Sequence, residues 1–138
     1  KRQSQKYRVQ DRVKFLGQIP FDQLARYYDA ADVLVFPALR DSGGSALLEA
    51  MSKGLPVICL DWGGPTEMVD AGSGVKIPIT TSDQTIQDFA DALVRLRNDP
   101  ELRLRLGTAA AERARSQFTW AAKRRLLEDT YHRLCATQ

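Results

Sequence analysis

The chain of 138 residues has about the length of one domain, and the 43% of its residues that are hydrophobic are enough to bury a core of ordinary size. Its longest apolar run, residues 33–39, contains a proline and is far shorter than the roughly 20 residues of a membrane-spanning helix, which excludes a membrane span. The formal charge is +3, but ten basic and five acidic residues from Arg95 onward give +5, whereas ten and twelve before it give −2.

The first ten residues are polar and basic, without the apolar stretch of a signal peptide, and the chain begins at Lys1 rather than Met. We therefore expect a single domain over residues 1–138 that is shortened at its N-terminus, with residues 1–10 as the remnant of a helix or a disordered start. Residues 11–80 carry the predicted β-α units, and residues 83–138 carry the predicted C-terminal helices.

From residue 11 to residue 80, short runs typical of strands alternate with helical patterns, which indicates parallel β-α units. The predicted strands are residues 13–16, 33–36, 57–60 and 75–77. Each is nearly continuous in apolar residues, as expected for strands that helices cover on both faces. The predicted fold class is α/β, a Rossmann-like parallel sheet with flanking helices and a helical C-terminal third.

Two short helices are predicted between the strands, over residues 22–30 and 45–53. Gly54 and Pro56 follow the second helix, and this pair is typical of a helix end. The second helix is the one that carries the candidate chemistry.

After residue 80 the pattern is helical throughout. Asp99 before Pro100 predicts a capped helix that runs to about residue 115, and Thr119 is expected to cap the last helix. One face of that last helix is apolar, so we expect it to cover an apolar surface, or to cause self-association if nothing covers it. The residues of this face are Trp120, Leu127, Tyr131 and Leu134.

The basic tail attracts phosphate, nucleic acid or anionic lipid by charge alone. No aromatic stacking pattern or recognition motif accompanies its arginines, so we interpret it as a solvated helix face and expect no nucleic-acid partner. Cys59 and Cys135 lack CxxC spacing, and only His132 could add a nitrogen ligand. We therefore expect free thiols in a reducing cytoplasm and no metal site.

Two carboxylates, Asp41 and Glu49, bracket a glycine loop and the start of a helix directly after the second predicted strand. In a doubly wound sheet, ligands bind beyond the carboxyl ends of the strands, and free N–H groups at a helix start favour an anion. Glu49 lies on a different side of the helix from its apolar residues, so we expect it to face the crevice and accept two vicinal hydroxyls. The loop therefore predicts a sugar nucleotide, although an aspartate before a helix is also often only a cap.

A second loop, residues 61–67, follows the next strand and reads DWGGPTE. The two loops are expected to lie side by side and to define one cleft. We interpret Glu67 as an ordinary charge in the first turn of a helix rather than as a ligand. Trp62 is expected either to stack on a base or sugar, or to pack under its own loop.

Residues 41–57 read DSGGSALLEAMSKGLPV. This stretch resembles the mark of the retaining glycosyltransferases of family 4, the glycosyl transferases group 1, in which a carboxylate, seven residues and a glutamate stand within E-G-x-G-x-x-x-x-E-A-M-x-x-G-x-P-V. Further landmarks of the family are similar to VKFLG at residues 13–17, ADVLVFP at 31–37, GGPTE at 63–67, DPEL at 99–102 and FTW at 118–120. The resemblance implies the C-terminal, donor-binding domain of the two-domain GT-B fold.

The resemblance also implies the roles of individual residues. Glu49 would hold the ribose of a nucleotide diphosphate sugar, and Asp41 would lie beside the hydroxyls of the transferred hexose, as a catalytic residue. The first loop would contact the phosphate or sugar through its backbone, and the second would line the same pocket. These donor-binding residues are Gly43, Gly44 and Ser45 in the first loop and Gly63 and Gly64 in the second.

Members of the family transfer the sugar with retention and without an obligatory metal or other cofactor, and the leaving diphosphate is thought to assist the acceptor. Asp41 replaces the usual first glutamate and reaches one methylene less far, which leaves the choice of sugar open. The family takes an arginine and a lysine for the diphosphate, and the acceptor groups, from regions before Lys1. We therefore expect the 138-residue chain alone to be inactive.

The sequence leaves several alternatives open. A non-catalytic flavodoxin-like module would bind a nucleotide or a protein partner, and a GT-B epimerase would reuse the same donor site without an acceptor. The favoured hypothesis is a sugar transferase of polysaccharide, lipid or other glycoconjugate assembly. Its acceptor would be a glycan or lipid bound by a missing N-terminal domain. The enzyme would be located in the cytoplasm, with peripheral association at the inner face of the membrane.

Overall fold

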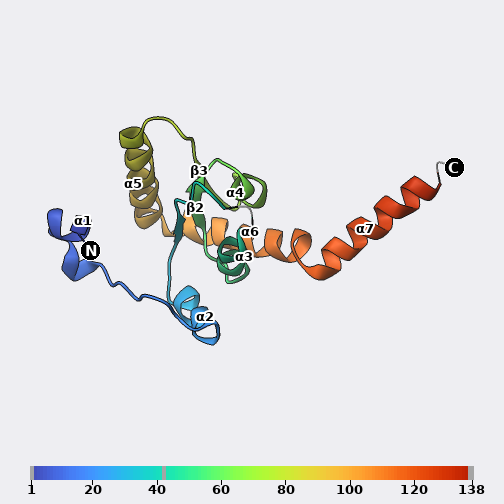
Figure 1. Cartoon of the computed structure of the whole chain (residues 1–138), viewed down its shortest axis with the longest axis horizontal. Helices are drawn as coiled ribbons and strands as arrows, with labels where there is room; N and C mark the ends of the chain where they lie inside the picture. Colours follow the sequence, from blue (N-terminus) through green and yellow to red (C-terminus); the bar gives the residue numbers. More distant parts are fainter. Residues whose placement is uncertain (1, 42, 137–138) are drawn as a thin grey trace.

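The computed structural model describes residues 2–41 and 43–136 (Figure 1). The elements are α1 (Arg2–Lys6), the 3-10 turn η1 (Gln10–Arg12), α2 (Phe21–Asp29), β1 (Leu34–Phe36), α3 (Ser45–Ser52), β2 (Val57–Leu60), α4 (Gly64–Met68), β3 (Gly74–Ile77), α5 (Ser82–Asn98), α6 (Pro100–Gln117) and α7 (Trp120–Cys135). The predicted α/β class is confirmed, and the helices predicted at residues 22–30 and 45–53 correspond to α2 and α3.

The three strands form a parallel sheet in the order β1-β2-β3. Val57 of β2 pairs with Leu34 on one side and with Gly74 on the other, and all of β2 is buried. The strands predicted at residues 33–36, 57–60 and 75–77 are therefore confirmed. Helices follow β1, β2 and β3 in turn, as the parallel arrangement requires.

Helices cover both faces of the sheet because alternate side chains of β2 point to opposite sides. On one face, Leu47 of α3 packs in a buried cluster with Cys59. On the other face, Leu96 of α5 packs in a second cluster with Ile58. Helix α6 contributes apolar residues to both clusters and closes the core along the edge between them.

Helix α6 crosses the end of α3 at very close range. A Cβ atom on Gly107 would overlap the carbonyl oxygen of Gly54 and would lie 3.0 Å from the carbonyl carbon of the same residue. Pro56 is the next neighbour, at 3.4 Å from such a Cβ atom. The two backbones can approach this closely only because Gly107 has no side chain.

The prediction of a strand at residues 13–16 is wrong. This segment is extended at Val13 but forms no ladder, and Val13, Phe15 and Leu16 are exposed. A strand needs the backbone of a neighbour to satisfy its N–H and C=O groups, and no described strand lies beside this one. In Figure 1 the segment leads away from the sheet toward α1.

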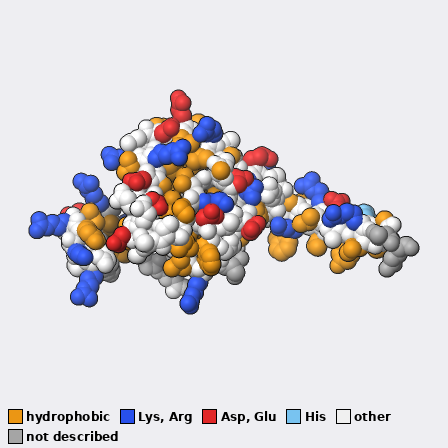
Figure 2. Space-filling view, turned by 90° about the horizontal axis from the view of Figure 1, so that it is seen from above, with side chains coloured by type: hydrophobic (Ala, Val, Ile, Leu, Met, Phe, Trp, Pro, Cys, Tyr) orange, Lys and Arg blue, Asp and Glu red, His pale blue; other side chains and the backbone are white. Residues whose placement is uncertain are grey.

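Helix α7 projects from the body of the molecule and packs on α6 only at its start (Figure 1). The expectation that its apolar face covers an apolar surface is not met within the described residues, since α7 contains no buried residue and Trp120 is 91% exposed. Figure 2 shows hydrophobic side chains exposed along this arm among lysines and arginines. Within the described ranges, no helix has the combined length and apolar content of a membrane span.

Candidate functional site

The loops that follow β1 and β2 meet at the carboxyl edge of the sheet. A Cβ atom on Gly63, in the second loop, would lie 3.5 Å from the carbonyl oxygen of Asp41 in the first. Gly44 lies against Met68 of α4, and a Cβ atom there would overlap the thioether sulfur. Gly44 and Gly63 have positive φ angles of 52° and 61°, which favour glycine. The structure thus brings the two predicted loops together.

The carboxylate of Asp41 folds back onto its own loop. Its Oδ1 accepts the backbone N–H groups of Gly43 at 2.9 Å and of Gly44 at 2.6 Å. These are two of the amides for which a phosphate or sugar contact was predicted, so here Asp41 takes the place that an anion would take. Oδ2 of Asp41 has no hydrogen bond to the described residues and can accept one from a hydroxyl. The amide of Ser45, at the first position of α3, points out of the same helix end without a partner in the described chain.

Glu49 lies one turn into α3 and is half-buried. Its Oε2 accepts a hydrogen bond from the hydroxyl of Tyr28, in α2, at 3.0 Å. Its Oε1 has no hydrogen bond to the described residues and is open to a ligand. The carboxylate therefore leaves the core side of α3 and faces α2.

A cavity of about 240 Å³ lies between α2 and α3, and both Tyr28 and Glu49 line it. Phe21 and Leu24 of α2 give it an apolar wall. Burial, followed by the hydrogen bond and the negative charge of Glu49, raises the pKa of Tyr28 above its ordinary value of 10.0. Tyr28 is therefore a neutral donor at neutral pH. Sequence reasoning missed Tyr28, because no local signal links it to a residue 21 positions away.

The second loop is fixed by Asp61. Its Oδ1 accepts a hydrogen bond from the hydroxyl of Thr66 at 3.1 Å and pairs with Nζ of Lys76 at 3.2 Å. The contact with Lys76, and then the one with Thr66, lowers the pKa of the Asp61 carboxyl group. Gly64 begins the short helix α4, as predicted. Trp62 is 59% exposed, so it does not pack under its own loop.

Arg113 of α6 holds the far end of α4. Its guanidinium donates to the carbonyl oxygens of Met68 at 2.7 Å and Glu67 at 3.0 Å, and it pairs with Asp70 at 2.7 Å. Two donors of the guanidinium thus bind carbonyl groups that the end of a helix leaves unpaired, and a third binds the carboxylate of Asp70. Glu67 enters these contacts through its backbone, and its side chain is exposed. The long arginine links α6 to the second loop, although the sequence pattern of α6 gave no sign of it.

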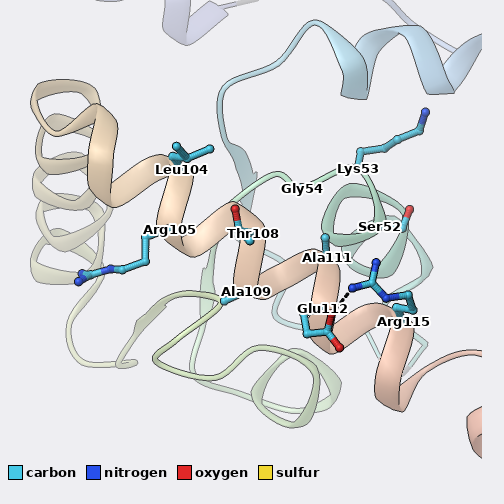
Figure 3. A pocket seen from close by; sticks show the side chains of 10 residues that line it. All are labelled: Ser52, Lys53, Gly54, Leu104, Arg105, Thr108, Ala109, Ala111, Glu112 and Arg115. Atoms are coloured by element: carbon cyan, nitrogen blue, oxygen red, sulfur yellow. Dashed lines mark hydrogen bonds and ion pairs between the residues drawn. The ribbon is translucent and has the colours of Figure 1, made fainter.

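A wide surface depression of about 1050 Å³ lies at the other end of α3, where α6 crosses it (Figure 3). Figure 3 shows that small side chains, such as Thr108 and Ala111, form much of its floor, and that Glu112 and Arg115 pair with each other at its edge. It lies away from the glycine loops, and none of the predicted site residues lines it. Among residues 2–41 and 43–136, no group of three or more His, Cys, Asp or Glu side chains is arranged to hold a metal ion.

Both loops, α3 and the strands that carry them fall within a stretch that known proteins share. The family described as Glycosyl transferases group 1 matches residues 1–113. The chain belongs to this family. Helix α7 lies beyond the matched residues, whereas Asp41, Glu49 and the glycines of both loops lie within them.

Relatives in the group 1 family agree with this assignment. The chain is 36% identical over 120 residues to D-inositol 3-phosphate glycosyltransferase of Corynebacterium aurimucosum, which covers 86% of the chain and 27% of the relative. It is 38% identical over 128 residues to the protein of the same name from Corynebacterium diphtheriae, over 89% of the chain and 28% of the relative. The chain thus spans little more than a quarter of the length of these relatives.

Solved structures show the same fold. Sucrose-phosphate synthase from Thermosynechococcus elongatus superposes with a TM-score of 0.79 and 34% identity over 99% of the chain and 33% of that protein. The C-terminal domain of a glycosyl transferase group 1 protein from Francisella tularensis superposes with a TM-score of 0.74, at 23% identity, over 86% of the chain and 60% of that domain, and supports the fold alone. The chain therefore has the Rossmann-like fold of a GT-B C-terminal domain.

Proposed function

We propose that this chain is the donor-binding part of a retaining glycosyltransferase that transfers a hexose from a nucleotide diphosphate sugar to a glycan, lipid or other acceptor. The observation that carries the proposal is the placement of Asp41 and Glu49 at the two ends of one glycine loop and helix start, within the part of the chain that matches the family. Each carboxylate keeps one oxygen free of hydrogen bonds within the described chain. Both can therefore accept hydroxyl groups of a ligand.

The proposed donor lies along the carboxyl edge of the sheet. The ribose hydroxyls bind Glu49, the diphosphate lies at the amide of Ser45 and the helix start, and the hexose lies beside Asp41. Gly63 and Gly64 form the facing wall, where the absence of side chains lets the sugar approach the backbone. Because Asp41 already holds the amides of Gly43 and Gly44, a phosphate that uses them has to displace its carboxylate.

The hydrogen bonds from the amides of Gly43 and Gly44 to Asp41 favour a second candidate function. A loop whose aspartate satisfies its own amides is also typical of a structural cap. In that case the chain is a non-catalytic member of the family that binds a nucleotide or a protein without chemistry. The two candidates differ in whether Glu49 and Asp41 contact the ligand.

Calorimetric titration of the chain with UDP-, GDP- and ADP-sugars, and with the free diphosphates, tests the proposal. One nucleotide class is expected to bind, and Glu49→Ala should weaken that binding by about ten-fold, since it removes hydrogen bonds to a charged acceptor. Glu101→Ala, in the first turn of α6, is a control that should leave the affinity unchanged. Equal affinity of the parent chain and the Glu49→Ala variant would count against the donor site.

Catalysis needs more than this chain supplies under the proposal. Acceptor groups and the cations for the leaving diphosphate would come from the remainder of a larger enzyme, so we expect the 138-residue chain to be inactive. No cofactor or metal is part of the proposed mechanism. The enzyme would act in the cytoplasm, with peripheral association at the inner face of the membrane, and transfer is favoured over epimerisation.

The exposed face of α7 supports a proposed contact. Trp120, Leu127, Tyr131 and Leu134 are each more than half exposed, and a single helix of 16 residues gains little stability from its own hydrogen bonds. We propose that an N-terminal domain of a larger enzyme covers this face, and that the 138-residue chain by itself self-associates through it. Sedimentation at high concentration tests the second statement, which a strictly monomeric chain would contradict.

A further inference from the structure

The hydroxyl of Tyr28 is the polar group that the described chain places on the carboxylate of Glu49. It comes from α2, donates to Oε2 at 3.0 Å, and is partly buried beside the cavity between α2 and α3. A glutamate side chain has three rotatable bonds, so an unrestrained carboxylate samples many positions. A hydrogen bond to one oxygen reduces that freedom and leaves the other oxygen for a ligand.

The nearest cation that lines the same cavity does not compete for Glu49. Nζ of Lys53 pairs with Oδ1 of Asp29 at 2.8 Å, so its charge is directed to α2. An ion pair with Glu49 would have taken the carboxylate oxygens that hydroxyl groups need. A neutral tyrosine hydroxyl, in contrast, fixes the carboxylate and preserves its negative charge.

We propose that Tyr28 is a positioning residue for the nucleotide donor. It holds the Glu49 carboxylate so that Oε1, and the remaining lone pair of Oε2, face the two vicinal hydroxyls of the ribose. This inference rests on the proposed function, because it requires Glu49 to contact the ribose. It adds a second helix, α2, to the binding site.

Two links between α2 and the α3 region allow the positioning role to be separated from a merely structural one. Tyr28→Phe removes the hydroxyl that reaches Glu49 and keeps the ring in place. Lys53→Met breaks the neighbouring ion pair with Asp29, releases no cation toward Glu49, and leaves Glu49 and Tyr28 intact. Both variants weaken the attachment of α2, but only the first releases the carboxylate.

The test measures the dissociation constants of uridine, guanosine and adenosine diphosphates and of their 2′,3′-dideoxy counterparts for the parent chain and these two variants. For the nucleotide that binds, Tyr28→Phe should weaken the ribose form about five-fold, as expected for one hydrogen bond, and leave the dideoxy form unchanged. Lys53→Met should change the affinity for neither form. A Glu49→Ala variant is measured in parallel and should lose the preference for the ribose form.

The possible results distinguish a failure of the positioning role of Tyr28 from a failure of the proposed donor site. If Tyr28→Phe leaves ribose binding unchanged, or weakens the ribose and dideoxy forms equally, Tyr28 is only a structural link and the inference is wrong. If Glu49→Ala keeps the full preference for ribose, or if the parent chain binds none of the nucleotides, the proposed function itself fails. Loss of the preference in Glu49→Ala together with its reduction in Tyr28→Phe supports both.

Discussion

Replacement of Gly107 by alanine should destabilise the chain, although the same change in an ordinary helix interior would stabilise it by about 1 kcal/mol. The added Cβ atom would overlap the carbonyl oxygen of Gly54 and would lie 3.0 Å from its carbonyl carbon. Both neighbours are backbone atoms, so no side-chain rotation relieves the overlap, and α6 has to move away from α3. Overpacking of this kind costs up to about 3 kcal/mol, which leaves a net loss of about 2 kcal/mol after the gain in helix propensity.

Urea unfolding, followed by circular dichroism, measures this loss. Gly43→Ala is the matched control, because a Cβ atom there has no described neighbour within 4 Å and the unfolding free energy should change little. In thermal unfolding, the Gly107→Ala variant should melt several degrees lower, at roughly 4 °C per kcal/mol for a domain of this size. A Gly107→Ala variant as stable as the parent chain would refute the close crossing of α3 and α6.

Two further predictions concern the contacts of α6 with the second loop. Arg113→Met should lower the unfolding free energy by about 1–3 kcal/mol, because it leaves carbonyl groups at the end of α4 without their donors. The exposed control Arg115→Met should change the unfolding free energy by less than about 0.5 kcal/mol. Equal effects of the two substitutions in urea unfolding would contradict the role of Arg113. Burial raises the pKa of Asp70, but the hydrogen bond from Ser73 and the charge of Arg113 outweigh it, so the pKa in the folded state lies below 3.8. A lowered pKa stabilises the folded state above the unfolded-state value, and this contribution is lost as the pH falls through the folded-state pKa. The difference in melting temperature between the parent chain and Asp70→Asn should therefore shrink below pH 3.8, and a constant difference would contradict the assignment.

The parts of the fold that the sequence predicted are those with strong local signals. Residues 57–60 are a continuous apolar run between two helices, and Asp99 and Thr119 are capping residues whose side chains accept from Leu102 and Ala122 in the structure. Residues 13–16, which were predicted to form a strand, have a similar apolar pattern, but no described strand lies beside them. Pairing depends on which strands surround a segment, and the pattern of the segment itself does not contain that information.

The sequence predicted the positions of the two loops of the candidate site but not the contacts of their side chains. The positions of the two loops follow from the rule for parallel sheets, and their contact through Gly63 and Asp41 agrees with it. The partner of Glu49 does not follow from any rule, because Tyr28 reaches it through the packing of α2 on α3. Gly107 carried a usable signal, since a glycine within a helical pattern usually marks a close approach, but the pattern does not say to which segment.

The proposed function requires a nucleotide sugar to bind at the carboxyl edge of the sheet, between the two glycine loops and Glu49. Amide chemical shifts of the labelled chain, recorded during titration with the nucleotide sugar that binds, locate this binding site. We expect the largest changes at residues 43–49 and at Gly63 and Gly64. Changes concentrated instead on the face of α6 that lines the wide depression, around Thr108 and Ala111, would contradict it.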